Sequence, residues 1–118
     1  MMEKKKVIVF DKRADSEDSW RELFLSALKY KADVKLIKYL SYFFFFEGKL
    51  DVLIYLKRKE EIEYFNDTLS YFARRLDAKL VTLGYNLPKK EIPAGFIGIS
   101  QKDFFSEEEL INAVLGET

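Results

Sequence analysis

The chain has 118 residues, in which twenty basic side chains balance twenty acidic ones, and it contains neither cysteine nor histidine. Its length suits one domain over residues 1–118, large enough to bury roughly two thirds of the surface of the unfolded chain. Without cysteine there is no disulfide or thiolate chemistry, which favours a cytoplasmic protein. Without histidine the commonest metal ligand and general base are missing, which weighs against an enzyme, and we expect no metal and no cofactor.

The charges are interspersed along the chain, which excludes some classes of partner. Apart from Lys4–Lys6, which we interpret as a solubilising flank, no charged block marks the protein for nucleic acid. The apolar runs are shorter than the about 20 residues that cross a bilayer, so we expect no membrane association. Abundant Lys and Glu, with one Gln and no Cys, give a thermophile-like composition.

The first two predicted elements are a strand and a helix. Residues 7–10, VIVF, are a short unbroken apolar run, typical of a strand buried on both faces, and the run ends at Asp11. From about Ser16 to Tyr30 the apolar residues have the spacing of a helix that packs on a core, with Asp15 or Ser16 as its cap. These apolar residues are Trp20, Leu23, Phe24, Ala27 and Leu28.

Strands and helices continue to alternate along the rest of the chain. Residues 34–37, 51–56, 78–83 and 96–99 are predicted strands, and Gly84 closes the fourth. Ser106 has capping-box spacing to Glu109 and opens a last helix that ends at Gly116. Between the third and fourth strands the spacing predicts a long helix, with apolar positions at Ile62, Phe65, Leu69, Phe72 and Leu76.

This alternation predicts a three-layer α/β domain, with a parallel sheet covered by helices on both faces. Five strands suggest the flavodoxin-like order 2-1-3-4-5. In that order ligands and chemistry lie at the carboxyl ends of the strands. The residues there are Asp11, Lys12, Leu56, Lys57, Gly84, Ser100 and Lys102.

The sequence resembles a two-component receiver domain over nearly its whole length. Residues 95–104, GFIGISQKDF, followed by SEEEL at 106–110, are similar to the receiver pattern of a glycine, a fifth strand, a lysine, a phenylalanine and a helix. Residues 40–56, LSYFFFFEGKLDVLIYL, resemble the family's second helix and third strand, and residues 5–11 its first strand. The resemblance implies the same fold.

The resemblance also implies a phosphorylation site, from which this chain departs. Receivers use a phosphorylated aspartate, an acidic pair that holds Mg²⁺, a hydroxyl residue and a lysine. The matching positions form a degenerate site of Asp11, Lys12, Leu56, Thr82, Gly84 and Lys102. Leu56, at the phosphoacceptor position, has no nucleophile, and Lys12 beside Asp11 opposes a divalent cation. We therefore expect no aspartyl phosphorylation by the usual route.

Two interpretations of the remaining charges stay open. Asp11, Lys12 and Lys102 could be a plain ion-pair cluster at one edge of the sheet. Alternatively, a fixed pair between Asp11 and Lys102 could lock one conformational state, as a bound phosphate otherwise would.

A shorter resemblance concerns residues 10–28, FDKRADSEDSWRELFLSAL, which look like the opening of a TIR domain. This resemblance implies an NAD-cleaving enzyme or an interaction domain, with a catalytic glutamate in the helix after the third strand. Glu60, Glu61 and Glu63 stand at the start of that helix, where they equally suit its dipole. Trp20 suits core packing as well as substrate stacking.

The leading hypothesis is a non-catalytic, receiver-like module for signalling or scaffolding that binds a protein partner or forms a homodimer. Receivers bind partners around the fourth helix, fifth strand and fifth helix. That region is rich in apolar residues here. The candidate interaction residues are Tyr42, Phe45, Tyr85, Ile92, Phe104 and Phe105.

The run YFFFF at 42–46 allows two structures. As a short helix over residues 40–47 it packs Leu40, Phe43 and Phe44 on the sheet, while Tyr42 and Phe45 point away. As part of a hairpin turning at Gly48, it divides its phenylalanines between two faces. In either structure we predict a homodimer or partner contact at Phe45.

Overall fold

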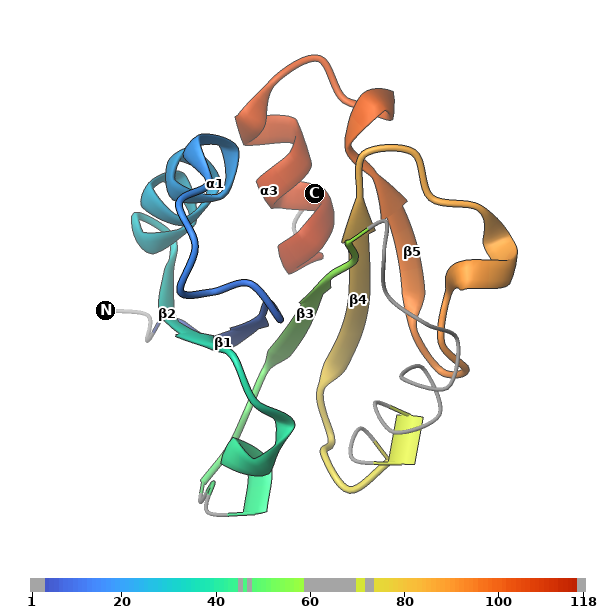
Figure 1. The fold of residues 1–118 in the computed structure, drawn as a ribbon. Coiled ribbons are helices and arrows are strands. Elements are labelled where there is room, and N and C mark those ends of the chain that lie inside the picture. The colour runs from blue at the N-terminus through green and yellow to red at the C-terminus, as the bar shows by residue number, and fades with distance from the viewer. Residues whose placement is uncertain (1–3, 45, 47, 59–69, 72–73, 117–118) are drawn as a thin grey trace.

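A computed structural model describes residues 4–44, 46, 48–58, 70–71 and 74–116 of the chain. Five strands form one parallel sheet in the order β2-β1-β3-β4-β5 (Figure 1). The protein is therefore an α/β domain with the flavodoxin-like strand order, as the alternation of elements predicted. The strands are β1 (Lys5–Phe10), β2 (Ala32–Ile37), β3 (Val52–Leu56), β4 (Lys79–Gly84) and β5 (Ile97–Ser100).

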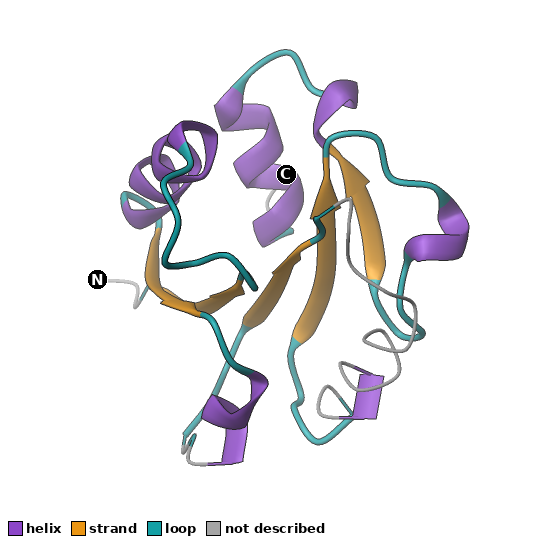
Figure 2. Ribbon diagram, in the orientation of Figure 1, coloured by secondary structure: helices purple, strands orange, loops and turns teal. Residues whose placement is uncertain are grey.

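One face of the sheet is covered by two helices, α1 (Ser19–Lys29) and α3 (Glu107–Leu115). Both lie on the same side of the strands, as the helical ribbons in Figure 2 show. Alternate strand residues and the apolar faces of both helices form the larger core cluster, in which Val9, Ile54 and Val81 are fully buried.

The opposite face has a smaller core cluster, covered by short helical segments. Phe10, Leu53 and Tyr55 point to this side, and the rings of Phe10 and Tyr55 stack with centroids 5.6 Å apart. The 3₁₀ helix η1 (Leu40–Phe44) and Leu76 pack there. Most of the helix predicted over residues 62–76 lies outside the described residues.

The start and the buried face of α1 differ from the prediction. The helix is capped by Asp18, whose side chain accepts the Arg21 N–H at 2.9 Å, and not by Asp15 or Ser16. Leu23, expected in the core, is 60% exposed. The buried face of α1 is rotated from the predicted one, and Arg21 points inward. The buried residues are Arg21, Phe24, Leu25 and Leu28.

Helix α3 begins and ends as predicted, and its end is tied to the sheet. The Ser106 hydroxyl accepts the Glu109 N–H at 3.2 Å, and Gly116 closes the helix with a φ of 75°, which favours glycine. Lys5 donates to the Leu115 carbonyl at 2.7 Å, and Lys79 donates to the Ala113 carbonyl at 2.9 Å. These cations satisfy carbonyls at the negative end of the helix.

The described part of the run YFFFF begins in a helix and packs on the smaller core cluster. Residues Leu40–Phe44 form η1, which agrees with the helix and excludes the hairpin strand over these residues. The prediction that Tyr42 points away from the sheet is wrong. Its side chain packs against the smaller core cluster together with Phe43 and Phe46. The ammonium of Lys35 lies 5.0 Å from the Tyr42 ring centroid. Phe45 lies outside the described residues, so a contact there stays a prediction.

Candidate functional site

The carboxyl edge of the sheet is built around one buried carboxylate. Asp11 directly follows β1 and is completely shielded from solvent. Arg58 stands two residues after the end of β3, and Arg21 lies in the first turns of α1. Because parallel strands end at the same edge, the fold brings these three residues together from separate parts of the sequence.

Two arginines bind Asp11. Arg58 forms a two-pronged contact, from Nε to Oδ1 at 3.0 Å and from Nη2 to Oδ2 at 2.5 Å. Arg21 Nη1 donates to Oδ2 at 2.9 Å, and the Arg13 backbone N–H donates to Oδ1 at 3.0 Å. An ionised carboxylate offers about four acceptor positions. All of them are filled, so Asp11 has no position left for a metal ion or a substrate proton.

Arg21 is fully engaged and orders the loop between β1 and α1. Besides Asp11, its guanidinium donates to the carbonyls of Arg13 at 2.8 Å and Ser16 at 2.6 Å, and to Glu22 at 3.1–3.3 Å. Its side chain is only 3% exposed. Buried charge is tolerated when every donor has a partner, and Arg21 meets this condition.

Arg58 connects this cluster to the helix cap. Its Nη1 donates to Asp18 Oδ2 at 2.6 Å, while Asp18 Oδ1 caps α1. Burial alone would raise the pKa of Asp11, but the hydrogen bonds from Arg58, the Arg13 N–H and Arg21 outweigh it and hold the pKa below its ordinary 3.8. The hydrogen bond to Asp11 raises the pKa of Arg58, although partial burial acts in the opposite direction.

The structure separates the residues of the predicted degenerate site. Lys12 and Lys102 are exposed, and the ion-pair partners of Asp11 are Arg21 and Arg58 in place of Lys102. Leu56 is a core residue, 4% exposed.

The other two matched positions, Thr82 and Gly84, lie on β4. Thr82 is buried beside Tyr55 on the face opposite Val81 and Leu83, and its hydroxyl oxygen has no hydrogen-bond partner within the described part of the chain. Gly84 ends the strand and lines the pocket described below.

Sequence reasoning missed Arg21, Arg58 and Asp18. One available signal was the position of Arg58 just after a buried strand. The other was the spacing of Arg21, which shares the i, i+3, i+4, i+7 pattern of a buried helix face with Phe24, Leu25 and Leu28. Arginine is rarely fully buried, so the apolar periodicity was assigned without it.

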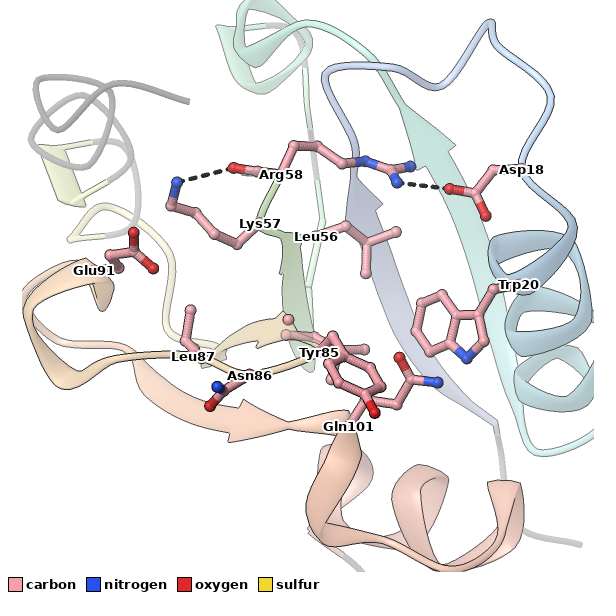
Figure 3. A pocket seen from close by; sticks show the side chains of 12 residues that line it. Asp18, Trp20, Leu56, Lys57, Arg58, Tyr85, Asn86, Leu87, Glu91 and Gln101 are labelled. Carbon is pink, nitrogen blue, oxygen red and sulfur yellow. Dashed lines mark hydrogen bonds and ion pairs between the residues drawn. The ribbon is translucent and has the colours of Figure 1, made fainter. Parts of the chain in front are cut away.

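A pocket of about 640 Å³ opens beside this cluster (Figure 3). Trp20 of α1 stands at one end with Tyr85 and Gln101, while Lys57 and Glu91 stand at the other. A second, adjoining pocket of about 400 Å³ shares the first three of these residues and adds Phe104 and Phe105. The complete lining of the larger pocket is Asp18, Trp20, Leu56, Lys57, Arg58, Leu83, Gly84, Tyr85, Asn86, Leu87, Glu91 and Gln101.

The candidate interaction residues are therefore divided. Tyr85, Phe104 and Phe105 gather around the smaller pocket, whereas Ile92 packs against the second core cluster, where Tyr42 also lies. Glu60, Glu61 and Glu63, which the TIR resemblance singled out, lie outside the described residues.

Comparison of the chain with protein-family models, with curated proteins and with solved structures finds no match. Among the described residues, no three acidic side chains gather as a group that could hold a metal ion. In the same residues no helix is both long and apolar enough to cross a membrane.

The buried cluster predicts that substitution of Arg21 and substitution of Lys102 have unequal effects on the stability of the fold. Arg21→Met keeps the length of the side chain but removes its charge, and we expect a loss of about 3 kcal/mol in the free energy of unfolding, as for a broken buried ion pair. Lys102→Ala changes an exposed residue and should cost under about 0.5 kcal/mol. Urea denaturation measures both, and equal losses would contradict the assignment of Arg21 as the partner of Asp11.

Asp11 also predicts a pH dependence. A carboxylate with a lower pKa in the folded than in the unfolded chain stabilises the fold above the unfolded pKa of about 3.9, and this contribution disappears as the pH falls through the folded pKa. The Asp11→Asn variant should be less stable at pH 7 but lose less stability on acidification. Denaturation curves across acidic pH test this; parallel losses in both proteins would rule it out.

Proposed function

We propose that the chain is a non-catalytic, receiver-like module that acts in signalling or scaffolding by binding another protein in the cytoplasm. The observation that carries this proposal is the saturated carboxylate of Asp11. In the receiver resemblance this residue is a metal-binding acid, yet here two guanidinium groups and a backbone N–H fill its acceptor positions. Arginine thus takes the place that a divalent cation would need.

The phosphoacceptor position supports the same proposal. Leu56 ends β3, is buried, and offers only carbon atoms. A phosphoryl group needs both a nucleophile and a cation at this edge, and the described residues provide neither in the expected place.

An apolar surface beside the cluster supports a binding role. The side chain of Phe105 is fully exposed and that of Tyr85 is 70% exposed, and both line the smaller pocket with Trp20 and Phe104. Neighbouring exposed aromatic residues are typical of protein-binding surfaces, because each buries a large area with few degrees of freedom. We propose this surface, around Phe105, as the contact for a protein partner or a second copy.

Incubation with a small phosphodonor and Mg²⁺ tests the absence of receiver chemistry. We expect the intact mass to stay unchanged, because Leu56 cannot accept a phosphoryl group and Asp11 has no free acceptor position. A stable gain of one phosphoryl group by the unmodified chain would overturn the proposal, whether or not the Asp11→Asn variant also gains it.

Site-specific photocrosslinking tests the surface in the cells that make the protein. A photoreactive residue in place of Phe105 should form a defined adduct with a partner or a second copy. The same residue in place of Tyr30, which is 86% exposed at the far end of α1, serves as the matched control and should not. Identical adducts from both positions, or none from Phe105, would contradict the assignment of this surface.

A further inference from the structure

The larger pocket has an aromatic wall whose orientation is fixed from behind. The indole of Trp20 stacks on buried Phe24, with ring centroids 5.3 Å apart and planes at 8°. One face of the indole is thereby occupied by the core, while the residue also lines the pocket. Tyr85 lines the same end of the pocket as Trp20, so a planar ring bound there could contact both aromatic side chains.

The loop that carries Tyr85 is tied to the end of β5. The Lys102 N–H donates to the Tyr85 carbonyl at 3.0 Å, and the Leu87 N–H donates to the Ser100 hydroxyl at 3.0 Å. Leu87 also packs closely over Gly84, where an added Cβ would lie 3.5 Å from its side chain. The backbone that carries Tyr85 is therefore fixed before a ligand binds, which lowers the entropic cost of binding.

The charges around the pocket cancel. Lys57 and Arg58 contribute two positive charges, and Asp18 and Glu91 contribute two negative ones. Arg58 is already bound to Asp18, and Lys57 donates to the Arg58 carbonyl at 3.0 Å. A ligand with a net charge would therefore find no opposite excess to compensate its lost hydration.

Two amide side chains supply neutral hydrogen-bonding groups in the same lining. Asn86 and Gln101 each offer a donor and an acceptor, and Gln101 lies at the aromatic end. Asn86 is exposed and Gln101 is partly buried, and a ligand that covers either amide removes its water. The mixed edge of a heteroaromatic ring can replace those hydrogen bonds, whereas a purely apolar ligand cannot.

We propose that this pocket binds an uncharged, planar heteroaromatic small molecule, stacked between Trp20 and Tyr85. The volume of about 640 Å³ falls within the range of small-molecule sites, roughly 300–1,000 Å³. The pocket lies at the carboxyl ends of β3 and β4, the edge at which open parallel sheets bind ligands. The inference concerns the pocket alone and does not depend on the partner surface at Phe105.

Trp20 is the only tryptophan of the chain and reports on the pocket directly. The probes are three neutral ring compounds, adenosine, thymidine and caffeine, with excitation where they do not absorb. We expect at least one to change Trp20 fluorescence saturably. Tyr85→Ala should weaken that binding at least tenfold, whereas Tyr39→Ala, a matched change of another exposed tyrosine outside the pocket, should leave it unchanged.

Three further ligands distinguish the alternatives. Ribose lacks a ring for stacking and should not bind, and AMP, which adds a phosphate to adenosine, should bind more weakly than adenosine if adenosine binds. N-acetyl-phenylalaninamide stands for an aromatic side chain of a protein partner.

Defined results would overturn the proposal. The first is the absence of a saturable fluorescence change with all three ring compounds, and the second is equal binding by the Tyr85→Ala variant. The third is tighter binding of AMP than of adenosine. The fourth is tighter binding of N-acetyl-phenylalaninamide than of every ring compound. The last result would assign the pocket to protein docking. Circular dichroism of each variant confirms that it is folded before its binding is compared.

Discussion

The carboxyl edge of this protein depends on the ion pairs of one buried carboxylate. Asp11 alone would be costly to bury in ionised form. Arg21 from α1 and Arg58 from the end of β3 neutralise it, and Asp18 binds Arg58 while capping α1. The start of α1, the loop before it and the end of β3 are thus joined through four side chains, and two of these, Asp18 and Arg58, line the larger pocket.

Stability alone does not account for this arrangement. Apolar residues of the same shape often stabilise a core as well as a buried ion pair does, because they avoid the desolvation of charge. The distinctive effect of the cluster is geometric. Arg21 donates to two loop carbonyls as well as to Asp11, so its hydrogen bonds connect both ends of residues 11–16 to α1. The cluster therefore specifies the loop more than it strengthens the core.

The sequence predicted elements better than it predicted contacts. Strand positions and their order follow from unbroken apolar runs, which have few alternative interpretations. The capping residue of α1 cannot be identified from a local pattern, because Asp15, Ser16 and Asp18 have similar preferences for the cap position. In the structure Asp15 pairs with Lys38, the Ser16 hydroxyl donates to the Arg13 carbonyl, and Asp18 caps the helix. The pairing of Asp11 with Arg58 spans 47 residues, and no local pattern in the sequence contains it.

The arginines that pair with Asp11 also shape the neighbouring pocket. Arg58 fills the acceptor positions of Asp11 on one side and lines the pocket on the other. Arg21 fixes the first turns of α1, and with them the position of Trp20 over Phe24. The charges of Asp11, Arg21, Arg58 and Asp18 are paired within the protein, and the aromatic side chains of Trp20 and Tyr85 line the pocket beside them. The proposed recognition at this pocket would therefore depend on stacking and shape, because the nearest charges are already paired with one another.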